Sequence, residues 1–313
     1  MAKIQKELMI ASIFSKSKPV NIIIIAAFLI LISTIYNWNL FFTDISRSGQ
    51  MVLNIIVLLF SLLIFDFINS KNNITQRNGF AVLCFGLVLG LFPEIIKHSE
   101  LLWSNVFLLF ALRRLVSLHS RKHVKKKLFD AGFWIGLAIL INPTLILILP
   151  ILVIAVGYYS GNDVKTAIIP IVGLLCVLVI KICYNILVFD TYFLERDLQV
   201  QFNLDLSNYW TQDSLTRIVP FLLILFWSLI KVIASYNERN TDEKPTYMIL
   251  IWYTISALLI IGFSVIQDGG QMIFLLVPAS FVVALNMETI DREWITNTII
   301  GVLIIAIIVN LVL

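Results

Sequence analysis

Long, strongly apolar stretches, such as 166–189 and 294–313, are separated along this chain by polar connections. A helix needs about 20 apolar residues to cross a hydrocarbon core that is about 30 Å thick. Inside that core every backbone polar group must be paired within its own segment, so such runs are helical. Hydrophobic residues make up 59% of the chain and charged residues only 13%, whereas a water-soluble domain has about a quarter of its residues charged. The sequence therefore predicts an all-α, polytopic membrane protein.

We predict about eleven spans (ten to eleven) within a single integral membrane domain, residues 1–313. A cytoplasmic segment, 1–19, precedes the first span, and the longest external loop is 190–214. The predicted spans are 20–37, 51–69, 79–96, 100–117, 129–142, 143–159, 166–189, 215–233, 246–265, 271–287 and 294–313.

The stretch 129–159 is too long for one untilted span and short for two. Pro143, preceded by Asn142, lies at its middle. Proline removes a backbone N–H and disfavours the helical conformation of the preceding residue. We therefore predict a helix break at Asn142 and Pro143, with one short helix on each side, and keep a single kinked span as the alternative.

The placement of basic residues supports this division. Lys and Arg in short loops are retained on the cytoplasmic side. With two helices in 129–159, the predicted outer side receives only a few of the 23 Lys and Arg residues: Arg47, Lys97, Arg196 and Arg217. The N-terminus is then cytoplasmic and the C-terminus external, in a bacterial inner membrane. The excess of positive charge is explained by orientation, so we expect no nucleic-acid partner.

Carboxylates in outer loops are candidates for catalysis, since a general base must face its substrate. Asp44 lies in the first outer loop, and Glu94 follows Pro93 at the end of the third span. Both are candidate catalytic residues, although each taken alone is more simply interpreted as an exposed loop carboxylate.

Charges within spans and in the longest loop are candidates for binding a substrate or its phosphate. Lys181 lies inside 166–189, where a charge is costly and often functional, although its amine can also extend to the interface. The loop 190–214 is acidic and aromatic, and is either a functional loop or an interfacial helix. Its charged candidates are Glu195, Arg196 and Asp197.

Motifs of soluble enzymes are missing from the sequence. There is no phosphate-binding GxxxxGK[ST], no GxGxxG, no GxSxG and no HExxH. The three histidines do not have the spacing of metal ligands. We expect neither a cofactor nor a metal.

Four segments resemble an uncharacterised family of bacterial polytopic inner-membrane proteins of similar length. They are SKSKP (15–19), FPE (92–94), ALRRLVSL (111–118) and LFDAGFWIG (128–136). The resemblance implies the membrane fold and no particular activity.

A second resemblance concerns the GT-C class of membrane glycosyltransferases and covers 107–180 and 267–286. A GxxxGLAxxxxPT stretch carries it, through Gly132, Gly136, Leu137, Ala138, Pro143 and Thr144. This class places a catalytic acid in the first external loop, which implies Asp44, and holds a lipid-linked donor phosphate with external Arg or His. Here that loop, 38–50, is short.

Three functions remain open. The first is an accessory, non-catalytic subunit or binder of lipid-linked substrates on a shortened GT-C-like scaffold, with a membrane protein as partner. The second is a glycosyltransferase that uses a polyprenyl-phosphate sugar. The third is a transporter or flippase, whose broken helices would meet near the midplane. A membrane domain with many apolar helices and few convergent polar groups favours the first of these functions over an enzyme.

Overall fold

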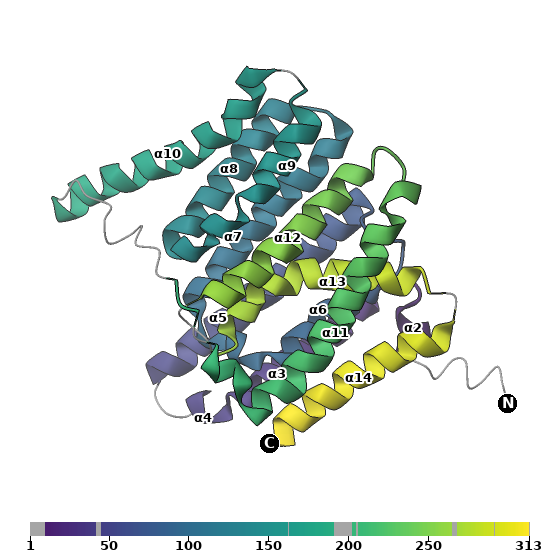
Figure 1. The fold of residues 1–313 in the computed structure, drawn as a ribbon. Coiled ribbons are helices and arrows are strands. Elements are labelled where there is room, and N and C mark those ends of the chain that lie inside the picture. The colour runs from purple at the N-terminus through teal and green to yellow at the C-terminus, as the bar shows by residue number, and fades with distance from the viewer. Residues whose placement is uncertain are drawn as a thin grey trace. The chain divides into compact units, whose positions relative to one another are not determined.

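The computed structural model describes residues 10–41, 45–161, 163–190, 202–204, 206–264, 268–290 and 292–312 (Figure 1). All regular elements within these ranges are helices, as the sequence predicts. The chain forms two compact units, Met1–Ser99 with Asp205–Glu238 and Ile266–Leu313, and Glu100–Leu204 with Arg239–Val265. The single membrane domain expected over 1–313 stays a prediction.

Eight helical segments in the described part of the chain are long and apolar enough to cross a membrane. They are Pro19–Tyr36, Ile45–Asn72, Ser99–Ser120, Val164–Phe189, Gln212–Glu238, Lys244–Phe263, Gly270–Glu288 and Glu293–Leu311. The other three predicted spans coincide with shorter or more polar helices, namely Phe80–Leu91, Val124–Ile141 and Pro143–Tyr159. Helices of this length and composition confirm a multi-pass membrane protein.

The first unit contains eight α-helices in its described residues and four short 3-10 helices. These are α2 (Ile10–Phe14), α3 (Pro19–Tyr36), α4 (Trp38–Phe41), α5 (Ile45–Asn72), α6 (Phe80–Leu91), η1 (Pro93–Lys97), η4 (Ser207–Trp210), α11 (Gln212–Ala234), η5 (Ser235–Glu238), η6 (Gly270–Met272), α13 (Ile273–Glu288) and α14 (Glu293–Val312).

The helix α13 forms the core of this unit. Its residues are buried from Ile273 to Met287, which is expected of a helix that is apolar on all sides. It packs against α6 and α11. The ring of Phe281 stacks on Phe65 of α5 with 4.4 Å between centroids, and Phe65 also contacts Phe85 of α6 at 5.0 Å. In contrast, α3 exposes most of its apolar surface, as a lipid-facing helix would.

Polar contacts join three chain segments at one end of the first unit. Ala11 of α2 donates its backbone N–H to Asn297 Oδ1 of α14 at 3.2 Å. Asn78, in the turn between α5 and α6, donates to Glu288 Oε1 at the end of α13 at 2.6 Å. The N-terminal segment, the turn 73–79 and the connection after α13 therefore share one end, and the sequence predicts all three to be cytoplasmic.

The second unit contains the remaining helices. These are α7 (Ser99–Val116), which begins at the last residue of the first unit, η2 (Ser117–Ser120), α8 (Val124–Ile141), η3 (Pro143–Ile148), α9 (Pro150–Tyr159), α10 (Val164–Phe189) and α12 (Lys244–Phe263).

The stretch 124–163 folds back on itself in the second unit. The helix α8 ends at Ile141, and α9 returns alongside it (Figure 1). Lys125 Nζ at the start of α8 lies 3.5 Å from Asp163 Oδ2, which follows α9. The chain therefore goes out and returns to the same end, so the prediction of two helices, rather than one kinked helix, is confirmed.

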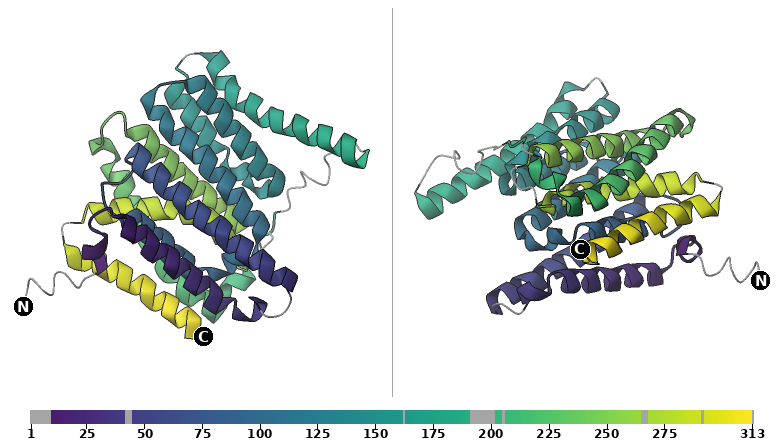
Figure 2. Two further views of the ribbon diagram at one scale, coloured as in Figure 1. Left: turned by 180° about the vertical axis from the view of Figure 1, so that it is seen from behind. Right: turned by 60° about the horizontal axis from the view of Figure 1, so that its bottom comes forward.

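Glycines allow α8 and α10 to pack backbone against backbone, and the two helices lie side by side (Figure 2). A Cβ atom on Gly132 would lie 2.1 Å from the backbone oxygen of Pro170. A Cβ atom on Gly173 would lie 2.4 Å from the oxygen of Phe129. Small residues at such crossings let membrane helices approach closely. Gly132, the first glycine of the GxxxG stretch, therefore has a packing role.

Candidate functional site

Several chain segments meet at the other end of the first unit. These are the C-terminal ends of α3 and α14, the N-terminal end of α11, and the 3-10 helices η1 and η6. Pro93 begins η1 directly after α6, because proline at a first helical position loses no hydrogen bond that the helix needs. This turn positions the next residue, Glu94, within hydrogen-bond distance of Tyr36 at the end of α3 and of Arg217 in the first half of α11.

Glu94 is buried and is held by two side chains. Its Oε1 accepts a hydrogen bond from Tyr36 Oη of α3 at 2.7 Å. The same oxygen accepts one from Arg217 Nη1 of α11 at 2.5 Å. The side chains of Arg217 and Glu94 are only 9% and 7% exposed. A buried charge is tolerated only when it is paired and hydrogen-bonded, so the two residues depend on each other.

Arg217 makes further contacts with the turn after α6. Its Nη1 also approaches the backbone oxygen of Leu91 at 3.4 Å. Its guanidinium carbon lies 5.8 Å from the ring centroid of Phe92, within the range of a cation–π contact. Phe92 packs edge-on against Phe221, one turn further along α11, at 5.7 Å. The guanidinium of Arg217 is thus held in place by the hydrogen bonds of Nη1 and by its contact with the Phe92 ring.

Several buried polar atoms in this part of the first unit have no partner among the described residues. Glu94 Oε2 and Arg217 Nε are both buried without a hydrogen-bond partner among the described residues. The same holds for Tyr209 Oη of η4 and Gln271 Oε1 of η6. Buried polar groups are nearly always satisfied by protein, water or ligand. Four such atoms belong to the ion pair and to the 3-10 helices η4 and η6.

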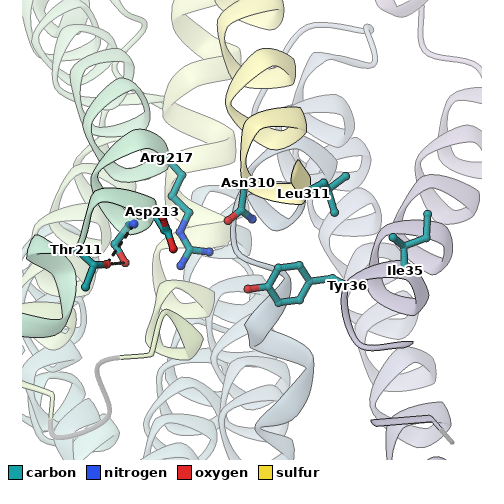
Figure 3. A pocket seen from close by; sticks show the side chains of 8 residues that line it. Ile35, Tyr36, Thr211, Asp213, Arg217, Asn310 and Leu311 are labelled. Carbon is teal, nitrogen blue, oxygen red and sulfur yellow. Dashed lines mark hydrogen bonds between the residues drawn. The ribbon is translucent and has the colours of Figure 1, made fainter. Parts of the chain in front are cut away.

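A pocket of about 520 Å³ opens beside Arg217. It is lined by Ile35, Tyr36, Thr211, Asp213, Ser214, Arg217, Asn310 and Leu311. Figure 3 shows the side chains of Arg217, Asn310 and Tyr36 turned toward one another across it. Asn310 Nδ2 is also buried without a partner among the described residues. The lining is thus polar in its centre, with the apolar side chains of Ile35 and Leu311 at one side.

A histidine–aspartate pair lies close to the ion pair. His98, just after η1, places Nε2 2.6 Å from Asp268 Oδ2, just before η6. Asp268 Oδ1 also accepts a hydrogen bond from the backbone N–H of Gly270 at 3.0 Å. Partial burial acts to raise the pKa of Asp268, but the hydrogen bonds from His98 and Gly270 and the charge of His98 outweigh it, so the pKa is lowered.

Tyr209 connects the two pairs electrostatically. Burial is the main cause that raises its pKa to about 12, and the negative charge of Asp268 adds to this, whereas Arg217 acts in the opposite direction. Tyr36, which donates to Glu94, also contacts a lysine: Lys97 Nζ lies 5.4 Å from the centroid of its ring. In the described part of the chain, no three His, Cys, Asp or Glu side chains gather as metal ligands would.

The structure brings only some of the predicted residues to this site. Of the two candidate catalytic carboxylates, Glu94 lies at its centre, in an ion pair. Asp44 lies outside the described residues, as do Glu195, Arg196 and Asp197. Their roles, and the glycosyltransferase function that depends on Asp44, stay predictions.

Two further predicted residues belong to the second unit. Lys181 of α10 places Nζ 5.6 Å from the ring centroid of Tyr184, three residues further on the same helix; its proposed phosphate contact stays a prediction. At the helix break, Asn142 is extended, and its Oδ1 accepts hydrogen bonds from Thr144 N at 3.2 Å and Thr144 Oγ1 at 2.7 Å. Asn142 therefore caps η3, which begins at Pro143.

Three residues of the site are not indicated by the sequence. Tyr36 ends the first span, where a tyrosine is ordinarily an interfacial residue. Asp213 and Asn310 lie at the ends of two later spans. Their common signal is a polar residue within one turn of the outer end of a predicted span, and this signal is too frequent in membrane proteins to select them.

The helices and the site together define a multi-pass helical membrane protein with a buried ion pair and a polar pocket at one end of its first unit. Residues 9–312 match a family of unknown function, DUF6427, and the chain belongs to this family. The predicted membership of an uncharacterised membrane family is therefore confirmed. No curated protein and no solved structure matches the chain.

Proposed function

We propose that this protein binds the polar head of a lipid-linked substrate in the pocket beside Arg217 and does not itself catalyse a reaction. The pocket is formed by the ends of three apolar helices, α3, α11 and α14. The ends of membrane helices lie at the depth of lipid head groups. A polar pocket with apolar side chains on one side is suited to a molecule that keeps its hydrocarbon chain in the bilayer.

The state of Glu94 supports binding over catalysis. A general base needs an oxygen that is within reach of the substrate proton. Glu94 Oε1 is already occupied by Tyr36 and Arg217, and Glu94 is not among the residues that line the pocket. Its function in this proposal is to fix Arg217, whose Nε is buried without a described partner beside the pocket.

The proposal includes an orientation. We place the protein in a bacterial inner membrane with the N-terminus in the cytoplasm and the C-terminus outside. The end that contains α2 and the turn 73–79 then faces the cytoplasm, and the pocket faces outward. The distribution of Lys and Arg supports this orientation.

An accessory role follows from a binding site without chemistry. The bound lipid would be presented to a membrane protein partner on a shortened GT-C-like scaffold. The support for this part is the sequence resemblance over 107–180 and 267–286, together with the two short helices that break at Asn142 and Pro143.

Filling the pocket tests the proposed function. In the N310F variant a ring replaces an amide whose Nδ2 has no described partner, so no hydrogen bond of that nitrogen is lost. The control is I308F, because Ile308 on the same helix is 53% exposed and does not line the pocket. Both variants keep the Glu94–Arg217 pair.

Native mass spectrometry in detergent would measure binding of three short-chain probes: a phosphatidylethanolamine, a phosphatidylglycerol and a polyprenyl phosphate. We expect N310F to lose at least about tenfold in affinity for the probe that binds best, which corresponds to about 1.4 kcal/mol. I308F should bind as the wild type does. Equal binding by wild type and N310F, with equal thermal stability, would overturn the proposed function.

A further inference from the structure

We propose that the head group recognised in this pocket carries a phosphate and a primary ammonium together, as phosphoethanolamine does. This inference rests on the proposed function and specifies its ligand. The observation behind it is that the pocket presents one cation and one carboxylate from the same helix, Arg217 and Asp213 of α11.

The two charges are placed side by side by the helix. Residues four apart lie on one face of a helix, with about 5–6 Å between their Cβ atoms. Asp213 and Arg217 have this spacing, and both line the pocket. The carboxylate of Asp213 makes no ion pair with a described residue, and the side chain is exposed. A ligand with two opposite charges a few ångströms apart can meet both.

Arg217 offers part of its guanidinium to a phosphate. Both of its hydrogen bonds to described residues leave from Nη1, and Nε is buried without a partner. Guanidinium groups bind phosphate through two adjacent N–H donors. Asn310 Nδ2, also without a described partner, adds a neutral donor to the lining of the pocket.

The charge balance disfavours a head group that is only negative. The positive charge of Arg217 is already matched by Glu94. Asp213 adds a second carboxylate to the lining. Lys97 is the next cation, and its Nζ lies over the Tyr36 ring, while Asp268 is engaged by His98. Arg217 and Lys97 together balance the charges of Glu94 and Asp213, so a bound phosphate leaves the pocket net negative unless the ligand brings its own ammonium to Asp213.

The hydroxyl groups that line the pocket are engaged within the protein, so we expect the charged groups to determine which ligand binds. Thr211 Oγ1 donates to Ser214 Oγ at 2.9 Å and caps the start of α11 by accepting from Ser214 N at 3.4 Å. These hydroxyls are used by the helix cap. The volume of about 520 Å³ exceeds what a phosphoethanolamine group fills, and the remainder can accept its glycerol.

Charge-selective variants test the inference. The wild type, D213N and D213E would be titrated with short-chain phosphatidylethanolamine, short-chain phosphatidylglycerol and soluble phosphoethanolamine, with native mass spectrometry as the readout. We expect the wild type and D213E to prefer the ethanolamine lipid over the glycerol lipid by about tenfold. D213N should lose this preference, while its affinity for the glycerol lipid stays equal or rises.

Soluble phosphoethanolamine distinguishes a lipid head group from a free small molecule as the natural ligand. Binding of phosphoethanolamine that is weaker than that of the lipid, and that is also reduced in D213N, identifies a lipid head group. Binding as strong as that of the lipid identifies the free molecule as the ligand, and both results support the recognition of paired charges.

Two results would overturn the inference and leave the proposed function standing. One is a wild type that prefers the glycerol lipid. The other is an unchanged preference in D213N while N310F still loses lipid binding. Failure of N310F to affect any lipid would instead overturn the proposed function itself.

Discussion

Glu94 and Arg217 are 123 positions apart in the chain, and yet Glu94 Oε1 lies 2.5 Å from Arg217 Nη1 in a buried ion pair. Such a pair is costly to break, because removal of one partner leaves the other charge buried without compensation. It is less costly to replace as a whole, because two uncharged side chains need no desolvation of charge. The two residues therefore contribute as a pair to the stability of the chain's first unit.

The R217M variant should lower the free energy of unfolding by about 3–5 kcal/mol. The double variant E94Q/R217M should recover a large part of this loss, since no charge remains buried. The measurement is thermal unfolding in a mild detergent. The control is R77M, because Arg77 is exposed and surface substitutions change stability by about 0.5 kcal/mol or less. A double variant as unstable as R217M would contradict the role assigned to the pair.

The pair of His98 and Asp268 predicts a dependence of stability on pH. The pKa of Asp268 is lower in the folded protein than in the unfolded chain. Its contribution is therefore complete above the unfolded value of about 4 and is lost as the pH falls through the lower folded value. Since the side chain of Asp268 is 48% exposed, we expect no more than about 1 kcal/mol.

The test for Asp268 compares wild type with D268N in unfolding experiments between pH 6 and pH 3, values chosen around the unfolded pKa of about 4. The difference in stability should be constant at the upper end and should shrink toward the lower end. A difference that stays the same across the whole range would show that the carboxylate does not titrate with a lowered pKa.

Two glycines of the second unit provide a matched test of helix packing. A Cβ atom on Gly132 would lie 2.1 Å from the oxygen of Pro170, whereas one on Gly157 would meet nothing within 4 Å. Both residues are inside helices, α8 and α9. The G132A variant should therefore lose about 1–3 kcal/mol, because α8 and α10 must move apart. The G157A variant should be neutral or more stable by about 0.5–1 kcal/mol, and equal effects of the two changes would exclude the backbone contact.

The helices of this protein can be predicted from local sequence, and the site cannot. Eight predicted spans coincide with helices long and apolar enough to cross a membrane, because apolar length decides them, and the break at Pro143 follows from the missing N–H. Glu94 and Arg217 are both noticeable as charges near the ends of spans. Their pairing depends on which helices pack together in the first unit, and apolar helices carry little information about their neighbours.

The residues that line the pocket illustrate the same limit. Tyr36, Asp213 and Asn310 come from the ends of α3, α11 and α14. Each is an ordinary residue for the end of a membrane helix. Only the convergence of the three ends, which are far apart in sequence, distinguishes them from other polar residues at the same depth.

The contact between Lys125 and Asp163 makes the orientation of the second unit testable. Because Lys125 Nζ lies 3.5 Å from Asp163 Oδ2, the start of α8 and the loop after α9 are at the same end of the second unit. The seven basic residues of 113–127 predict that this side is cytoplasmic. Reporter fusions after residues 163 and 240 should both read as cytoplasmic, and a fusion in the loop 190–214 should read as external.

Replacing Lys122, Lys125, Lys126 and Lys127 by Gln should weaken this orientation, because the retention of positive charge orients short loops. If the fusion after 163 were external in the unaltered protein, α8 and α9 would enter the membrane from the opposite side and the predicted orientation of the second unit would be wrong.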